Sequence, residues 1–471
     1  MLLYEKVFDE LKKSIDDGLY AVGDRLPGVR KYSKTRGVSV STVLSAYYQL
    51  EDDGYVESII KSGFYVKNRA RVFIESPEQS SPISKPKTVT GQEMVLQMIK
   101  SINIPSLTNF GTAAPASSFL PTKLVSDAVI QVSRTHSDEI SKYESPLGNQ
   151  VLRQSITRRM TQAGCKTSIQ DVLITVGCQE AIHLALMACT NPGEVVAVES
   201  PTYYGFLQII DSLNLKALEI PTDPKTGISL SALKLAIEQW PIKACVLVPT
   251  FSNPLGSCIP DNKREALVTL LTESNVTLIE DDVYGELAHN SRRPPTLKSF
   301  DKTDNVIYCS SFSKSLSPGL RVGWVASKKY VERIEYLKYV LNFSTTTVSQ
   351  LAVAKILDSG KFDRYLNKAR REYAVAVPKM INAIYKLFPE GTKVTQPIGG
   401  YVIWVEFPHN INTSDLANEL LVEGISIAPG NIFSAVGKYD NFMRISCACK
   451  WTEDIELALL KIVKYYFKQK K

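Results

Sequence analysis

The chain opens with apolar residues at helical spacing. Four of them share one helical face with polar residues between, which predicts a helix over residues 2–19 that ends near Gly18. Those four residues are Leu3, Val7, Leu11 and Ile15. A second helical face runs through residues 38–50, and residues 54–56 and 63–66 predict two short strands. The first seventy residues therefore predict a small helical unit that ends in two strands.

Farther along, short apolar runs end in polar turns. Residues 172–176, 244–248 and 276–279 are rich in Val, Ile and Leu, which predicts buried strands. A glycine-containing junction to an apolar helix follows the first run, and a Pro/Gly-punctuated turn follows the second. Polar groups at the C-terminal ends of strands suit a ligand site, and a junction of strand, glycine and helix is common in α/β folds.

The stretch between these two parts has a different composition. Residues 75–87 are rich in Pro, Ser and charged side chains and cannot bury a core, so we interpret residues 69–105 as a linker. Within it, residues 92–102 predict a short helix that docks on the following domain. The domain boundaries that we expect are 1–68, 69–105 and 106–471.

Composition is that of a folded protein with more than one core. The chain has 471 residues, of which 44% are apolar, and its net charge of +7 permits nucleic-acid binding without demonstrating it. Residues 1–70 hold 11 Lys and Arg against 10 Asp and Glu. Five cations crowd residues 25–36, opposed there only by Asp24, and they suit a phosphate-facing patch, although a solvated helix face is the ordinary alternative.

Other classes of protein are not indicated. No secretory leader pattern and no apolar run of about twenty residues occurs, so we expect a cytoplasmic protein without membrane contact. The eight cysteines are scattered, and the close pair Cys447 and Cys449 lies on a predicted strand, so we expect reduced thiols. The four histidines show no paired ligand spacing, and we expect no metal centre.

One lysine has neighbours that suit an aldehyde cofactor. Lys314 follows three serines and a phenylalanine, where it could hold pyridoxal phosphate as a Schiff base. That cofactor needs a carboxylate partner for its protonated pyridine nitrogen, a role that suits Asp281, and donors to its ring oxygen, a role that suits Tyr284 and Asn253. Taken alone, each residue has a plainer interpretation as a strand end, a cap or a turn. Their combination favours the cofactor.

A phosphate group would also find donors. Gly177, Cys178 and Gln179 join a strand to a helix, and free backbone N–H groups at a helix start bind anions. Arg321, with Ser311 and Ser313 as further donors, would add charge-assisted hydrogen bonds. Such junctions are common in α/β folds, so the signal depends on its combination with Lys314.

From about Phe110 onward these blocks resemble the fold-type I aminotransferases, in family order. The resemblance implies a large mixed sheet sandwiched by helices, a smaller α+β domain and the cofactor pyridoxal 5'-phosphate. It implies that Lys314 forms the internal aldimine and that Asp281, Asn253 and Tyr284 contact the pyridine ring. The roles that rest on the resemblance alone are ring stacking by Tyr203 or its neighbour Tyr204, a phosphate contact to the other subunit of a homodimer by Tyr143, and an α-carboxylate clamp by Arg444.

The first seventy residues resemble the winged helix-turn-helix of the GntR regulators. The resemblance implies that the helix after residue 38 is a recognition helix for a double-stranded DNA operator. We expect DNA contacts from Arg25, Arg30, Lys31, Ser39, Ser41 and Thr42. The family often has an arginine where Val40 stands, which puts the main base contact in doubt.

The two parts together resemble the MocR group of GntR-type bacterial regulators. The resemblance implies a transcriptional regulator whose aminotransferase-like domain senses pyridoxal phosphate or an amino-compound effector. The intact Lys314 leaves catalysis open, so the alternative is an active aminotransferase with an N-terminal regulatory DNA-binding module. A third hypothesis is a sensor of the cofactor alone, in which Arg444 would be a structural residue.

Overall fold

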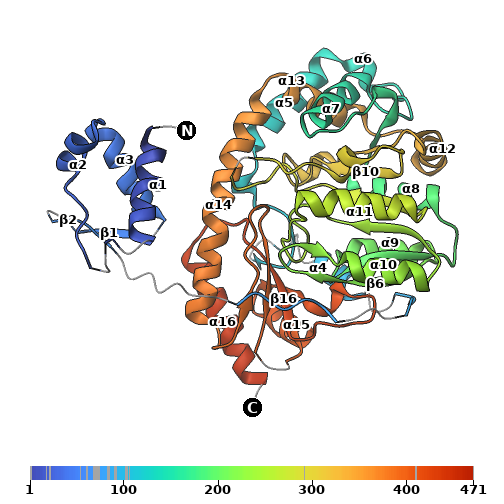
Figure 1. The fold of residues 1–471 in the computed structure, drawn as a ribbon. Coiled ribbons are helices and arrows are strands. Elements are labelled where there is room, and N and C mark those ends of the chain that lie inside the picture. Colours follow the sequence, from blue (N-terminus) through green and yellow to red (C-terminus); the bar gives the residue numbers. More distant parts are fainter. Residues whose placement is uncertain are drawn as a thin grey trace. The chain divides into compact units, whose positions relative to one another are not determined.

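The computed structural model describes most of the chain. The described residues are 3–16, 19–20, 23–53, 55–59, 62–66, 75–81, 85–89, 93–100, 104, 107–290, 292–408 and 411–469. The chain divides into two compact units, Met1–Phe73 (unit 1) and Ile74–Lys471 (unit 2) (Figure 1). The boundaries that we expected at residues 68 and 105 stay predictions.

Unit 1 contains three helices and a two-stranded sheet within its described part. These are α1 (Leu3–Asp16), α2 (Val29–Arg36), α3 (Val40–Asp52), β1 (Val56–Ile59) and β2 (Gly63–Val66), and the strands are antiparallel. Val7 and Leu11 of α1 are buried with Val43 and Leu50 of α3, which is the core that the helical spacing predicts. The helix expected over residues 2–19 is described from Leu3 to Asp16, and residues 2 and 18 lie outside the described part.

Unit 2 is built on a mixed eight-stranded sheet in the order β4-β11-β10-β9-β8-β5-β6-β7. The strands are β4 (Val172–Thr175), β5 (Val195–Ser200), β6 (Lys216–Asp223), β7 (Gly227–Ile228), β8 (Ile242–Leu247), β9 (Thr277–Asp281), β10 (Val306–Ser311) and β11 (Gly323–Ala326). Strands β6, β5, β8, β9 and β10 are parallel to one another. Strand β7 pairs antiparallel with β6, β11 with β10, and β4 with β11. The three apolar runs predicted as strands are β4, β8 and β9.

Both faces of this sheet are buried by helices. Alternate residues of β8 belong to different cores, with Ala244 and Val246 in one apolar cluster and Cys245 and Leu247 in the other. A strand covered on both faces reads as a continuous apolar run, which explains why the sequence shows no polar alternation here. The helices are α5 (Thr122–Thr135), α6 (Ser137–Ile140), α7 (Gln150–Gln162), α8 (Cys178–Cys189), α9 (Tyr204–Ser212), α10 (Leu230–Gln239), α11 (Asp261–Glu273), α12 (Val331–Asn342) and α13 (Thr347–Asp358).

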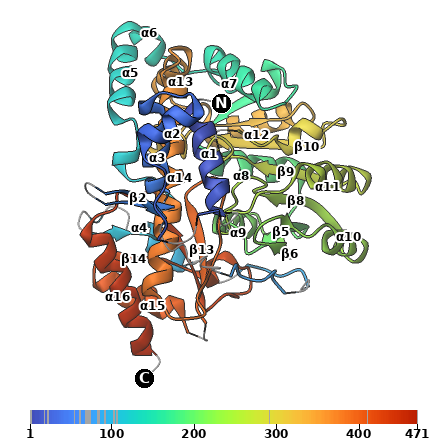
Figure 2. The same cartoon turned by 60° about the vertical axis from the view of Figure 1, so that its left-hand side comes forward.

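A smaller subdomain follows in the sequence. Its sheet has the order β12-β13-β16-β15, and the long helix α14 runs from α13 at one end to α16 at the other (Figures 1 and 2). The bounds are α14 (Lys361–Leu387), β12 (Lys393–Val394), β13 (Val402–Glu406), α15 (Thr413–Val422), β14 (Ile425–Ser426), β15 (Ala428–Pro429), β16 (Phe442–Ser446) and α16 (Glu453–Gln469). Strand β14 pairs with β3 (Thr108–Asn109). The predicted strand position of Cys447 and Cys449 is wrong, since β16 ends at Ser446.

Part of the expected linker lies on unit 2. Lys87 pairs with Ala217 in β6 through two backbone hydrogen bonds of 2.9 Å, and Ser80 accepts a hydrogen bond from the backbone of Thr222. The short helix expected over residues 92–102 is α4 (Glu93–Lys100), and residues 92, 101 and 102 lie outside the described part. A Pro/Ser-rich segment can thus be held by backbone pairing without forming a core of its own.

No helix in the described part of the chain is both long and apolar enough to cross a membrane. All eight cysteines are free thiols.

Candidate cofactor and nucleic-acid sites

A cavity of about 400 Å³ lies at the carboxyl ends of β4, β8, β9 and β10. Strands that run the same way end at the same edge of the sheet, so residues far apart in the sequence meet there. Most of the predicted cofactor residues line this cavity. They are Cys178, Gln179, Tyr203, Asn253, Asp281, Tyr284, Ser311, Ser313, Lys314 and Arg321.

Lys314 follows β10 and is the only described amine that lines the cavity. Its Nζ donates a hydrogen bond of 2.6 Å to the backbone carbonyl of Ala113. Burial, with repulsion from the cations Arg444 and Arg321, lowers the pKa of Lys314 from 10.5 to about 8. A lysine that loses its proton near neutral pH can attack an aldehyde.

Asp281 is the last residue of β9 and is fully enclosed. Burial raises the pKa of its carboxyl group from 3.8 to about 7, since hydrogen bonds to the carboxylate only partly offset desolvation. Oδ1 accepts from the backbone N–H of Val283 at 3.2 Å and from the thiol of Cys178 at 3.4 Å. A buried carboxylate beside a cavity suits a cationic partner such as a protonated pyridine nitrogen.

The start of α8 and Arg321 form an anion cradle. Gly177 precedes the helix with φ of 81°, and a Cβ at this position would overlap the guanidinium of Arg321. Arg321 donates to the hydroxyl of Ser313 at 3.3 Å and to the carbonyl of Val176 at 2.8 Å. Free helical N–H groups beside a guanidinium suit a phosphate.

Two tyrosines compete for the position that faces a cofactor ring. Tyr203 and Tyr204 both line the cavity, with ring centroids 4.7 Å apart. Tyr204 packs on Phe433 at 5.6 Å between ring centroids, and the cation Arg444 partly offsets the rise that burial gives the pKa of Tyr204. The ring of Tyr203 is therefore more available to a cofactor than that of Tyr204, and the stacking role of Tyr203 stays a prediction.

Arg444 does not line the cavity. It is fully buried in β16, where its guanidinium donates to the amide oxygen of Asn253 at 3.1 Å and to the carbonyl of Gly111. Its Nε finds no hydrogen-bond acceptor among the described residues. A buried guanidinium with an unsatisfied donor is suited to an incoming carboxylate, provided that the contacts with Asn253 and Gly111 open.

Tyr143 is also outside the cavity. Its side chain is 85% exposed, and its ring lies 4.7 Å from that of Phe343. Within one chain this tyrosine contributes nothing to the cavity.

Several cavity residues were missed from the sequence. Ile99, Thr112, Ala113, Ala114, Ile182, Val248 and Val283 line it as well. Val248 and Val283 could have been found, because Val248 ends the apolar run 244–248 and Val283 lies between the predicted site residues Asp281 and Tyr284. Ile99 carries no local signal, because it belongs to the segment interpreted as a linker.

In unit 1, the predicted hydroxyls gather at the start of α3. Ser39 is the N-cap, and its Oγ accepts from the backbone of Thr42 at 3.1 Å and contacts the hydroxyls of Ser41 and Thr42 at 2.8 and 2.7 Å. An exposed, capped helix start bearing hydroxyls can bond phosphate oxygens.

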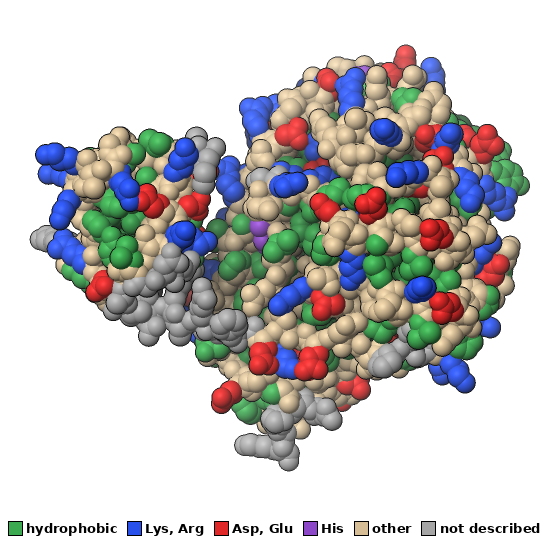
Figure 3. Space-filling view, in the orientation of Figure 1, with side chains coloured by type: hydrophobic (Ala, Val, Ile, Leu, Met, Phe, Trp, Pro, Cys, Tyr) green, Lys and Arg blue, Asp and Glu red, His purple; other side chains and the backbone are tan. Residues whose placement is uncertain are grey.

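The predicted basic residues are exposed on the same unit, and Figure 3 shows Lys and Arg side chains on its surface. Arg30 and Lys31 lie in the first turn of α2, and Arg25 lies against Gly63 at the start of β2. Asp24 is the acidic residue within the basic run, and in the structure Arg36 also forms an ion pair with Glu10 of α1. Residues distant in sequence provide that partner.

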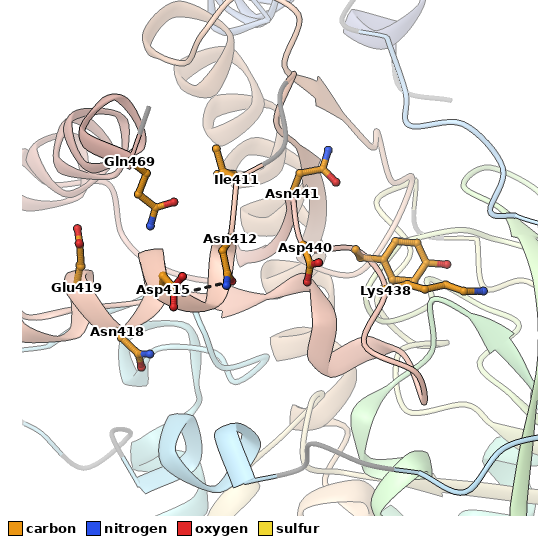
Figure 4. Close-up of a pocket in the computed structure, with 10 residues that line it drawn as sticks. Ile411, Asn412, Asp415, Asn418, Glu419, Lys438, Asp440, Asn441 and Gln469 are labelled. Carbon is orange, nitrogen blue, oxygen red and sulfur yellow. Dashed lines mark hydrogen bonds between the residues drawn. The ribbon is translucent and has the colours of Figure 1, made fainter. Parts of the chain in front are cut away.

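A larger cavity lies elsewhere in unit 2. It has a volume of about 1040 Å³ and is lined by α15, the end of α16 and residues 438–441 (Figure 4). Two of its charged side chains are already paired, Lys438 with Glu219 and Glu419 with Lys468. This cavity offers no cradle comparable with the one near Lys314.

Comparisons with known proteins match a family to each of the two parts of the chain. The family described as "Aminotransferase class I and II" matches residues 108–462, and "Bacterial regulatory proteins, gntR family" matches residues 3–66. The HTH-type transcriptional regulator YjiR of Escherichia coli is 37% identical over 462 residues, which cover 98% of each chain. Aromatic-amino-acid aminotransferase 1 of Thermococcus litoralis is 27% identical over 75% of this chain and 86% of its own.

Solved structures match the second part. Kynurenine aminotransferase from Pyrococcus horikoshii has a TM-score of 0.75 at 26% identity, over 81% of this chain and 96% of its own. The α-aminoadipate aminotransferase LysN from Thermus thermophilus, complexed with N-(5'-phosphopyridoxyl)-L-leucine, has the same TM-score, identity and coverage.

Proposed function

We propose that this chain, which belongs to the MocR group of GntR-type transcriptional regulators, controls transcription through a sensor built from its aminotransferase-like unit. Its cofactor is pyridoxal 5'-phosphate. The observation that carries the proposal is the meeting of Lys314, Asp281 and the Arg321 cradle in one cavity of a chain that also holds a helix-turn-helix unit.

The cavity residues fit this cofactor by their own chemistry. Bound pyridoxal phosphate supplies an aldehyde carbon and an electron-withdrawing ring. We propose that Lys314 attaches the cofactor, that Asp281 faces the pyridine nitrogen, and that Asn253 and Tyr284 donate to the ring oxygen. Cys178 steadies Asp281 through its thiol.

The phosphate would lie at the start of α8. We propose that the backbone N–H groups of residues 177–179, the guanidinium of Arg321 and the hydroxyls of Ser311 and Ser313 hold it. Gly177 supports this assignment, because any side chain there would collide with Arg321.

The effector would be an amino compound with a carboxylate. Arg444 is buried with an unsatisfied Nε and is linked to the cofactor wall through Asn253. We propose that a carboxylate replaces the contacts of Arg444 with Asn253 and Gly111, so that effector binding also changes the surroundings of the ring oxygen.

We propose a homodimer as the working form. Tyr143 is exposed and outside its own cavity, and α12 presents the exposed apolar side chains of Tyr336, Val340 and Leu341. A second copy would cover this apolar surface and accept Tyr143 at its phosphate site.

Unit 1 would bind an operator DNA with α3. The proposed contacts are the hydroxyls of Ser39, Ser41 and Thr42 and the cations Arg25, Arg30 and Lys31, which would mainly position α3 on the phosphate backbone. A cytoplasmic location is part of the proposal, because the operator must be accessible.

The second candidate function is aminotransferase catalysis. It is favoured by Lys314 with its lowered pKa and by the buried Arg444, which would serve an enzyme as well as a sensor. Release of a keto acid from an added amino acid, with lasting loss of the visible cofactor band, would favour this candidate.

The decisive experiment compares the visible spectrum and the DNA binding of the full chain with those of Lys314→Ala. We expect the wild type to show the band of lysine-bound cofactor, and cofactor addition to change which genomic DNA fragments it retains. Lys314→Ala should lose both effects and still bind DNA. Arg444→Ala should keep the band and lose its response to amino acids. DNA binding that ignores both the cofactor and Lys314 would refute the sensor.

A further inference from the structure

Helix α4 belongs to the segment that precedes the aminotransferase fold, yet it forms a wall of the cofactor cavity. Ile99 is 39% exposed and lines the same cavity as Tyr203 and Tyr204. Val95 lies one helical turn before Ile99, Met98 lies directly before it, and both are buried. Because positions i, i+3 and i+4 share a helical face, α4 directs one apolar face into unit 2.

That face packs on the residues that hold Arg444. Val95 and Met98 share an apolar cluster with Tyr204, Trp404 and Phe433. The guanidinium of Arg444 lies 5.5 Å from the ring centroid of Phe433, and Phe433 in turn packs on Tyr204 at 5.6 Å between centroids. A change around Arg444 therefore reaches α4 through direct packing.

The segment that leads to α4 is tied to both subdomains of unit 2. The carbonyl of Glu75 accepts from the backbone of Val394 in β12 at 3.0 Å. Ser80 and Lys87 bond the backbone of β6, as described above. The same stretch of chain thus contacts the small sheet, the large sheet and the cavity.

The described cavity wall has few charges left for an effector. Its charged side chains are Asp281, Lys314 and Arg321, and each has a role toward the cofactor. The other side chains that line the cavity are apolar, aromatic or uncharged polar. A charged effector side chain would lose its hydration without gaining a partner there.

We propose that the effector is an amino acid with an apolar side chain and that Ile99 is a specificity-determining residue for it. Helix α4 then transmits effector binding to the 75–100 segment. This inference rests on the proposed function, because it takes Arg444 as the carboxylate site. The side chain packs on Ile99, and the resulting shift of α4 moves the segment that continues to unit 1.

The test uses the cofactor-loaded full chain and four amino acids, L-leucine, L-phenylalanine, L-glutamate and L-lysine, titrated against the visible band. We expect L-leucine or L-phenylalanine to act at concentrations at least tenfold below the two charged amino acids. Ile99→Ala should weaken that response about tenfold, because most of the apolar contact is lost. Ile99→Lys should shift the preference toward L-glutamate.

Leu96→Ala is the matched control, because Leu96 is 53% exposed on the same helix and does not line the cavity. It should respond as the wild type does. In hydrogen exchange, a concentration of L-phenylalanine that changes the protection of residues 75–100 in the wild type and in Leu96→Ala should have a smaller effect in Ile99→Ala.

The outcomes separate two failures. A missing visible band in the wild type would refute the proposed cofactor function itself. A normal band together with a preference for L-glutamate, or with equal responses of Ile99→Ala and Leu96→Ala, would overturn this inference. A normal band without any amino-acid response would also overturn it and would leave a sensor of the cofactor alone.

Discussion

Lys314 shows how a residue's surroundings set its chemistry. Its sequence neighbours, three serines and a phenylalanine, say nothing about its pKa. Burial and the nearby cations Arg444 and Arg321 lower that pKa to about 8, and the carboxylate of Asp281 opposes the shift. The amine is therefore partly neutral at physiological pH.

We predict a matching pH dependence for cofactor attachment. Below about pH 8 Lys314 is mostly protonated and cannot attack, so the attachment rate should rise with pH and level off above about 8. Rapid-mixing absorbance after adding pyridoxal phosphate to cofactor-free protein measures this rate. Arg444→Met removes a repelling cation and should move the midpoint upward. A wild-type rate still rising steeply near pH 10 would contradict the lowered pKa.

Asp281 leads to a prediction about stability. Burial raises its pKa to about 7, so between about pH 4 and 7 the folded, cofactor-free protein holds a proton that the unfolded chain has lost. Its contribution to stability must fall as pH rises through this window. Asp281→Asn avoids that loss, so its Tm relative to the wild type should increase from pH 4.5 to 7 and then stay constant.

Other carboxyl groups titrate in both proteins and cancel in this difference. Calorimetry or a dye-based melting curve gives the two Tm values. A Tm difference that does not vary between pH 4.5 and 8 would show that Asp281 is ionised throughout.

At the level of elements, local sequence signals succeeded where turn residues marked both ends. The strands β4, β8 and β9 lie where their apolar runs predicted them, and the start of α8 follows Gly177. The start of α3 is likewise local, because Ser39 caps it. Helix α4 was expected only as a docked helix, and its place in the cavity wall was not predicted.

Two substitutions of Ser39 distinguish its role as a helix cap from its proposed contact with DNA. Ser39→Ala should destabilise α3 by about 1 kcal/mol, because a backbone N–H loses its acceptor. Ser39→Asp keeps the cap but adds a negative charge beside the DNA phosphates. We expect hydrogen exchange of the α3 amides to speed up only in Ser39→Ala, and DNA affinity to fall more in Ser39→Asp. Equal DNA affinities of Ser39→Asp and the wild type would place α3 away from DNA.

At the level of the whole molecule, one chain leaves the proposed site incomplete. Tyr143 faces solvent, and the exposed apolar residues of α12 have no cover within the described chain. These two observations are explained together by a second copy, which the order of residues in a single chain cannot show.

A charged substitution on the exposed apolar surface of α12 tests the proposed dimer. Val340→Glu should convert a dimer of twice 52.3 kDa into a monomer and weaken cofactor binding, because the partner's tyrosine is lost. Val422→Glu is the control, since Val422 is 89% exposed on α15. Light scattering gives the mass, and absorbance titration gives cofactor affinity. A wild-type monomer that binds the cofactor tightly would contradict the proposal.

The sequence was sufficient for the two-part architecture, for three of the strands that end at the cavity and for most of the polar residues that line it. Those features depend on helical or strand periodicity and on turn chemistry, which are properties of neighbouring residues. Only the tertiary structure decided three other features, which are the burial of Arg444, the contact of Cys178 with Asp281 and the presence of Ile99 in the cavity. Each of these features depends on residues that are far apart in the chain. Arg444 and Asn253, for example, form a hydrogen bond although they are 191 positions apart, and a local sequence pattern cannot predict such a contact.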